Sequence, residues 1–114
     1  MKDDTSTLAA RAALAKPIID HVAGQVGIAR EALIGRKRGV LSTYRKITWY
    51  LLRKHTVLSL QDIGGLFDGR DHTTILYGDQ DITRAMISTD NPVQHMATQL
   101  EDSYLAKLTH SPHE

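Results

Sequence analysis

The sequence predicts an all-α fold, a bundle of about five to six helices, and three observations support this. The chain has 114 residues, the length of one domain, and 41% of them are apolar, which is enough for a single modest core. Aromatic residues are scarce, so this core must consist mainly of Leu, Ile, Val and Ala. Only three prolines occur, and long alternating runs of β-branched residues, which are typical of strands, are missing.

The composition also argues against several functional classes. With no cysteine, the chain cannot form disulfides, cysteine-based zinc sites or a thiol nucleophile. The six histidines lack the spacing of metal ligands, and no serine or carboxylate pair stands in a catalytic context, so we expect no metal, no cofactor and no enzymatic activity. The polar N-terminus and the lack of a long apolar run predict a cytoplasmic protein with no membrane contact.

The first third of the chain contains three predicted helical segments. Residues Leu8–Ala15 are rich in alanine, and Pro17 suits the first turn of a separate helix over about 17–26 better than a helix interior. A short helical turn is expected at Arg30–Leu33. The apolar residues that recur at helical spacing, and so belong in the core, are Ile18, Ile19, Val22 and Val26.

A basic loop follows at residues 35–43, "GRKRGVLST", in which glycines bracket three consecutive cations. Ser42 or Thr43 can cap the next helix, which we expect over 44–55. Trp49 is interpreted as a partly buried packing residue rather than a platform for base stacking. The expected inward face of this helix comprises Ile47, Tyr50 and Leu51. Its outward side and its ends comprise Arg45, Lys46, Arg53 and Lys54.

Charge is unevenly distributed along the chain, although the net charge is only +1. Residues 30–54 carry eight Lys or Arg against one acid, Glu31, whereas residues 55–114 carry three basic residues against nine acidic ones. Such segregation fits a local positive surface that binds phosphate. It equally fits a solvated helix face beside an acidic neighbour, and charge alone leaves both interpretations open.

Two helices joined by a tight turn are predicted between residues 59 and 87. Ser59 caps a short helix, with Asp62 as its capping-box partner. Residues 68–69 (Asp-Gly) form the turn, and Asp71 caps the second helix. The apolar faces of the two helices are formed by Leu60, Ile63, Leu66 and Phe67, and by Ile75, Ile82 and Met86. A short helix, a glycine turn and a longer helix together indicate a helix-turn-helix.

A last amphipathic helix is predicted to open at residues 91–92 (Asn-Pro), because proline suits the first helical position. Its apolar positions are Val93, Met96, Leu100, Tyr104 and Leu108. We therefore expect three segments: a helical extension over residues 1–16, a helix-turn-helix domain over 17–88, and a C-terminal helix with a frayed tail over 89–114.

Three small polar residues, His72, Thr73 and Thr74, stand at the N-terminus of the second helix of the helix-turn-helix. In this motif that end of the helix meets base edges in the major groove of DNA. A threonine methyl can pack on a thymine methyl, and histidine can hydrogen-bond a purine edge. The alternative is that Asp71 and the threonines merely start the helix, a place where such residues are common.

The segment "LSLQDIGGLFDGRDHTTILYG", residues 58–78, resembles the signature of the C-terminal DNA-binding domain (domain IV) of the bacterial chromosomal replication initiator DnaA. The resemblance covers about residues 17–86, and includes the order of a first helix, a short helix, a basic loop and a basic-tipped helix. It implies a Trp-repressor-like helix-turn-helix fold. It also implies double-stranded DNA as the partner, bound at short asymmetric sites similar to the DnaA box.

The resemblance also implies roles for particular residues. Base edges in the major groove are read by Asp71, His72, Thr73 and Thr74. Positions that resemble phosphate anchors are Arg45, Lys46 and Arg70. An arginine of the family's basic loop enters the adjacent minor groove; Arg38 is the best match, and Lys37 or Arg36 takes this place if the loop alignment slips. Leu60, at the start of the short helix, is implied to touch a thymine methyl.

The sequence departs from the family pattern in three respects, one of which is that its basic loop has fewer arginines than the typical one. No phosphate loop of the GxxxxGK type occurs, so ATP hydrolysis is not expected of this chain. Asp79 and Asp81 stand where family members usually carry basic residues, and they would lower the affinity for DNA if they approached phosphate.

We therefore expect a stand-alone, nucleoid-associated regulator of replication initiation or transcription that binds DnaA-box-like DNA and lacks the initiator's ATPase module. Two alternatives stay open. One is an interaction module that docks on the replication initiator or on other replication proteins, for which the acidic C-terminal half is a candidate surface. The other is a transcriptional repressor with the same helix-turn-helix but its own operator.

Overall fold

The computed structural model of the protein describes residues 7–36, 39–88 and 90–109, and these residues form six α-helices and no strand. The helices are α1 (Leu8–Val26), α2 (Arg30–Ile34), α3 (Val40–His55), α4 (Leu60–Leu66), α5 (His72–Ile87) and α6 (Pro92–Thr109). The predicted all-α class is therefore confirmed, and the short helical turn predicted near residue 30 is present as α2.

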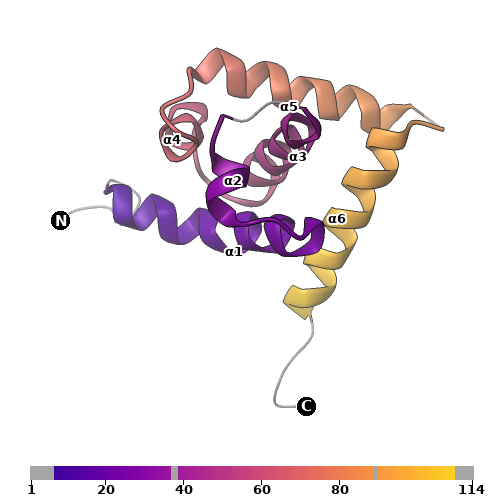
Figure 1. Ribbon diagram of the computed structural model, residues 1–114, viewed down its shortest axis with the longest axis horizontal. Coiled ribbons are helices and arrows are strands. Elements are labelled where there is room, and N and C mark those ends of the chain that lie inside the picture. The colour runs from indigo at the N-terminus through magenta and orange to yellow at the C-terminus, as the bar shows by residue number, and fades with distance from the viewer. Residues whose placement is uncertain (1–6, 37–38, 89, 110–114) are drawn as a thin grey trace.

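α3 is the central helix of the bundle, because it contacts each of the other five. Figure 1 shows α1 and α5 on opposite sides, with α2, α3 and α4 between them, and α6 running from the end of α5 back toward α1. One apolar core fills the space between these helices. Its largest fully buried side chains include Ile18, Leu33, Ile47, Leu51, Ile63, Phe67, Ile75 and Ile82.

α1 is one continuous helix, so the prediction of separate segments before and after Pro17 is wrong. Thr7 caps the helix, and the Ala10 N–H donates to the Thr7 hydroxyl at 3.0 Å. Pro17 lacks the N–H that would bond the carbonyl of Ala13, but both residues are exposed, so water can satisfy that carbonyl. The buried face continues on both sides of the proline, from Ala15 onward, and this packing holds the helix together.

α3 begins four residues earlier than the predicted helix over 44–55, and neither Ser42 nor Thr43 is its cap. Its N-cap is Gly39, which has a φ of 90°, a conformation that favours glycine because other residues meet a steric penalty there. This conformation lets the chain enter the helix directly from the basic loop, and the Ser42 N–H donates to the Gly39 carbonyl at 2.9 Å.

The predicted helix-turn-helix is confirmed in α4 and α5. The Asp62 N–H donates to the Ser59 hydroxyl and the Ser59 N–H donates to the Asp62 carboxylate, both at 3.0 Å, which completes the predicted capping box. α4 and α5 pack against each other and against α3. Ile75 and Ile82 are buried in this contact, and Met86 is half-buried.

α6 begins at Pro92 as predicted, and the Val93 N–H donates to the Asn91 side-chain oxygen at 2.8 Å. Of the predicted apolar positions of this helix, Leu100 and Tyr104 are buried, whereas Leu108 is exposed. The predicted frayed tail beyond residue 109 lies outside the described residues.

Several polar side chains join α6 to α1 and α3, and we call them the α6 polar cluster (His21, Lys54, His55, Glu101 and Tyr104). Glu101 accepts hydrogen bonds from His55 and from Lys54, both at 2.8 Å. The Tyr104 ring lies between two imidazoles, with centroids 5.8 Å from His21 and 5.7 Å from His55. Because His21 and Glu101 are both buried, this part of α6 docks through polar as well as apolar contacts.

The described part of the chain lacks two further features. None of its helices is both long and apolar enough to cross a membrane. Within the same residues, no group of three or more histidine and acidic side chains is arranged so as to hold a metal ion.

Candidate nucleic-acid interface

The N-terminal end of α5 presents polar side chains to solvent. Asp71, His72 and Thr74 are exposed and Thr73 is half-buried, whereas the next residue, Ile75, is fully buried. Ile75 therefore anchors the first turn of the helix in the core, and this fixes the direction of the preceding side chains.

Asp71 is the N-cap residue of α5, as predicted, but its carboxylate makes no capping bond to the helix backbone. It accepts a hydrogen bond from the Thr73 hydroxyl and lies 3.3 Å from Nδ1 of His72. The hydrogen bond from Thr73 is the largest of the effects that lower the pKa of Asp71. The three side chains therefore form one small polar unit at the helix start rather than three independent groups.

The turn before α5 depends on close backbone approach to α4. The Arg70 N–H donates to the Gly64 carbonyl at 2.9 Å, and a Cβ at Gly64 would overlap the Arg70 carbonyl oxygen. Asp68 and Gly69 follow each other in the left-handed region, with φ of 63° and 67°. Glycine at position 64 is therefore a steric requirement of the turn.

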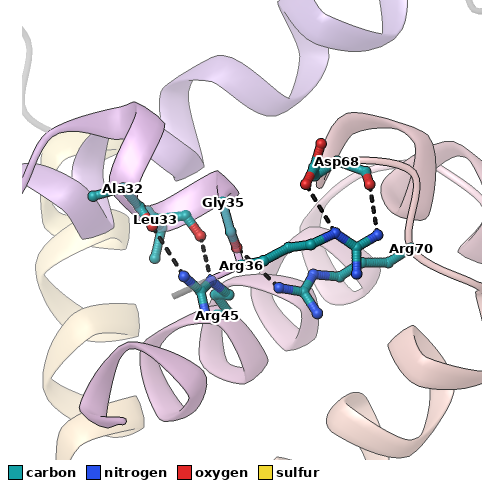
Figure 2. A network of polar contacts seen from close by, with 7 residues as sticks. All are labelled: Ala32, Leu33, Gly35, Arg36, Arg45, Asp68 and Arg70. Atoms are coloured by element: carbon teal, nitrogen blue, oxygen red, sulfur yellow. Dashed lines mark hydrogen bonds and ion pairs between the residues drawn. The ribbon is translucent and has the colours of Figure 1, made fainter. Parts of the chain in front are cut away.

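Two arginines tie this turn to the basic loop between α2 and α3. Arg36 of the loop donates from Nε to the Asp68 carboxylate and from Nη2 to the Asp68 carbonyl, each at 2.8 Å. In the opposite direction, Arg70 of the turn donates to the Gly35 carbonyl at 2.9 Å. Figure 2 shows the two side chains passing each other between the loop and the turn. We call Arg36 and Arg70 the crossed arginines.

The prediction that Arg45 lies on the outward side of its helix is wrong, because the residue is only 2% exposed. Its Nε donates to the Leu33 carbonyl at 2.8 Å and its Nη2 to the Ala32 carbonyl at 3.1 Å (Figure 2). The last carbonyls of a helix as short as α2 have no partner within the helix. The Arg45 guanidinium fills that need and so fixes the start of the basic loop.

Arg70 also has a packing role, since its guanidinium carbon lies 5.6 Å from the centre of the Trp49 ring. Trp49 is 3% exposed, which confirms that it packs in the core. Two buried side-chain nitrogens in the described residues lack a hydrogen-bond partner, Nε1 of Trp49 and Nε of Arg70. The predicted contact of Arg70 with phosphate stays a prediction beside these structural contacts.

Positive charge is crowded at this junction. Burial, and then repulsion from Arg70, lowers the pKa of Arg45. Burial, and then repulsion from Arg36, lowers the pKa of Arg70. The guanidinium groups of Arg36, Arg45 and Arg70 therefore lie close enough together at this junction to repel one another, although Arg45 is buried.

The other predicted contact residues have different surroundings. Lys46 is about two-fifths exposed, and its Nζ lies 2.9 Å from the carboxylate of Asp81 on α5. Leu60, the first residue of α4, is half-buried against the core. Lys37 and Arg38, the other candidates for the minor groove, lie outside the described residues, so of the three loop candidates the structure places only the exposed Arg36.

The sequence interpretation missed Tyr77, which is 62% exposed on α5. It lies three to four residues after the polar helix start, so it shares their face of the helix, and it lines the groove between α3 and α5 with Lys46 and Thr74. The next residue, Gly78, is where α5 meets α3, because a Cβ there would lie 2.5 Å from the Trp49 ring. Counting three residues on from Thr74, or four from Thr73, as residues on one helix face are spaced, would have identified Tyr77 from the sequence.

The fold and this site together define a helix-turn-helix protein whose second helix presents a polar, exposed N-terminus beside a basic loop. The family described as bacterial dnaA protein helix-turn-helix matches residues 15–82, more than half of the chain. The chain therefore belongs to the bacterial DnaA helix-turn-helix family, and this membership implies DNA binding.

Curated relatives agree with this membership. The chain is 37% identical over 86 residues to the chromosomal replication initiator protein DnaA of a Picosynechococcus species, and 40% identical over 88 residues to that of Thermus thermophilus. Each match covers 75% of this chain, but only 19% and 20% of the relative. A match of 44% over 69 residues to the DnaA of a Synechococcus species covers 59% of this chain and 15% of the relative. The chain thus spans about a fifth or less of these relatives.

Proposed function

We propose that this chain binds double-stranded DNA sequence-specifically at sites similar to the DnaA box. One observation carries the proposal: the exposed polar end of α5 (residues 71–74) is tied by the crossed arginines to a basic loop. A helix end that meets base edges and a cationic loop beside it are the two parts that major-groove and minor-groove contacts require.

In the proposed complex the N-terminus of α5 enters the major groove. The methyl groups of Thr73 and Thr74 then pack on thymine methyls, while the His72 ring hydrogen-bonds a purine edge. The loop that begins at Arg36 reaches the neighbouring minor groove, and Lys46 neutralises a phosphate. Arg45 acts indirectly, by holding the loop through the end of α2.

The proposed biological role is regulation of replication initiation or transcription on the nucleoid. Its support is that the relatives are chromosomal replication initiator proteins, of which this chain matches a small part that includes the helix-turn-helix. A chain with this helix-turn-helix can occupy the same sites as an initiator. Docking on the initiator and binding to a separate operator are the rival roles.

A binding titration tests this proposal. The purified chain is titrated against a DnaA-box duplex and a scrambled duplex of equal length, at two salt concentrations. We expect tighter binding to the box, and weaker binding to both duplexes at the higher salt. Equal affinity for the two duplexes would refute sequence specificity at the box. Binding to neither duplex would contradict the proposal and favour docking on the initiator.

A matched pair of variants tests the proposed contact surface. Thr73→Ala is expected to reduce discrimination between box and scrambled DNA by about 1–3 kcal/mol, because a base contact is lost. Thr83→Ala is the control: this residue lies on the same helix, is exposed, and donates its hydroxyl to the Asp79 carbonyl. The assignment fails if both variants discriminate as well as the unmodified chain.

A further inference from the structure

Among the described residues that line the groove between α3 and α5, Asp81 is the single acidic one. The basic lining residues of the groove are Arg36, Arg45, Lys46 and Arg70. Arg45 and Arg70 donate to backbone carbonyls, which carry no net charge, so these bonds leave the positive charge of the guanidinium groups in place. Arg36 pairs with Asp68 and Arg45 is buried, so Asp81 compensates much of the positive charge that remains in the groove, and its absence would make the groove more attractive to phosphate.

Asp81 binds two cations from opposite sides. One carboxylate oxygen lies 2.9 Å from Nζ of Lys46 on α3, and the other lies 2.6 Å from Nη2 of Arg84, one turn further along α5. The hydrogen bond from Lys46 is the largest of the effects that lower the pKa of Asp81. The carboxylate therefore stays ionised and holds Lys46, a lysine that lines the groove.

The neighbouring Asp79 differs from Asp81 in position. Both are half-buried, but burial raises the pKa of Asp79, and the positive charge that opposes this effect is that of Arg53 rather than that of a groove residue. Only Asp81 lies on the same helical stripe as Thr74 and Gly78, the stripe that faces α3 and leads away from the polar end of α5.

We infer that Asp81 attenuates DNA binding, because Lys46 must leave this carboxylate before it can contact a phosphate. The inference rests on the proposed function. It assigns to Asp81 a role in setting affinity rather than specificity, since a phosphate contact carries no base information. An uncharged residue at this position would free Lys46 and leave base discrimination unchanged.

The test compares Asp81→Asn with the unmodified chain on the box and scrambled duplexes over a range of salt. We expect Asp81→Asn to bind both duplexes about 3- to 10-fold more tightly at low salt, with a salt slope steeper by about one unit, as one added phosphate contact requires. Asp81→Glu keeps the charge and is expected to bind as the unmodified chain does.

Two controls distinguish the Lys46–phosphate contact from the general electrostatic effect of removing one negative charge from the protein. Asp102→Asn removes the same charge from an exposed position on α6 and should leave both affinities within about twofold of the unmodified chain, because a distant exposed charge is screened. In a Lys46→Met background, Asp81→Asn should give no gain in affinity. Thermal unfolding of each variant shows whether it is folded.

The outcomes distinguish attenuation from the proposed function. If the unmodified chain prefers the box and Asp81→Asn gains nothing, attenuation is wrong and the proposed function stands. Attenuation is also wrong if Asp102→Asn gains as much affinity as Asp81→Asn. If neither the unmodified chain nor Asp81→Asn binds either duplex, both proposals fail. If only Asp81→Asn binds, attenuation is supported.

Discussion

The loop-and-turn junction and the α6 polar cluster use polar side chains in opposite ways. At the junction, the crossed arginines bind a carboxylate and backbone carbonyls at the edge of the molecule, where Arg36 and Asp68 are both more than half exposed. In the α6 polar cluster, His21 and Glu101 are 4% and 7% exposed and lie between helices. The junction therefore positions a surface, whereas the cluster docks a helix.

This contrast determines which changes each region should tolerate. Both regions join segments far apart in the sequence, residues 36 and 68 in one and residues 55 and 101 in the other. At the junction, steric overlap limits which substitutions are tolerated, because backbone segments approach each other closely there. In the α6 polar cluster, protonation limits which changes are tolerated, because the charged forms of buried groups carry a desolvation cost.

The largest effect is expected at the junction from Gly64→Ala. The added Cβ overlaps the Arg70 carbonyl oxygen, which is backbone and cannot move away cheaply. We expect the free energy of unfolding to fall by about 3 kcal/mol, at the upper end of the usual cost of overpacking. Chemical denaturation measures this free energy of unfolding.

Gly65→Ala is the matched control for that substitution, one residue along the same helix. A Cβ at Gly65 meets nothing within 4 Å, and alanine has the higher helix propensity. We expect a gain in stability of up to about 1 kcal/mol. Equal losses for the two variants would show that close approach of the turn is not what requires Gly64.

Arg45→Met should have the next largest effect. It keeps an apolar stem in the buried site but leaves the Ala32 and Leu33 carbonyls without their donor, at a cost of about 2 kcal/mol in unfolding free energy. Lys46→Met, at the neighbouring half-exposed position, should cost less than about 1 kcal/mol. If instead Lys46→Met is the more destabilising of the two, the structural role of Arg45 is wrong.

The smallest effect concerns pH and the α6 polar cluster. Burial lowers the pKa of His21, and the charge of Lys107 adds to this. For Glu101, burial acts to raise the pKa, but hydrogen bonds from Lys54 and His55 outweigh it, so the pKa is lowered overall. Both groups bind protons less readily in the folded protein than in the unfolded chain. Their contribution to stability is therefore complete at neutral pH, and it is lost as the pH falls below about 6.5 for His21 and below about 4.3 for Glu101.

Glu101→Gln tests this dependence. The amide keeps the shape of the carboxylate but neither its charge nor its titration, so the unfolding free energy at pH 7 should fall by on the order of 1 kcal/mol. Its decline below about pH 4.3 should be shallower than in the unmodified chain. If the unfolding free energy of Glu101→Gln declines with falling pH in parallel with that of the unmodified chain, this carboxylate is not the source of the low-pH decline.

Local signals explain why the helix-turn-helix was predictable. The capping box at Ser59, the turn at Asp68 and the Asn-Pro start of α6 each involve residues within three positions of one another, so the sequence displays them directly. At the start of α5, Asp71, His72 and Thr74 are exposed and Thr73 is half-buried, because Ile75, within the same turn, is anchored in the core.

The errors have the opposite origin, because they depend on contacts that no local pattern displays. Arg45 is buried because the carbonyls at the end of α2, 12 residues earlier in the chain, need hydrogen-bond donors. Pro17 lies inside α1 because apolar packing continues on both sides of it. The start of α3 is a different case, because its N-cap, Gly39 with a φ of 90°, directly precedes Val40, so this error concerns a local choice between possible caps.

The position of Trp49 makes the junction optically observable. It is the one tryptophan in the sequence. Its ring meets the edge of Phe67 at the end of α4, the guanidinium of Arg70 in the turn, and Gly78 on α5. Any displacement of the turn from α3 changes the surroundings of this indole. Its emission therefore reports the state of the turn in the unlabelled protein, and it can be followed during the same titrations with DNA.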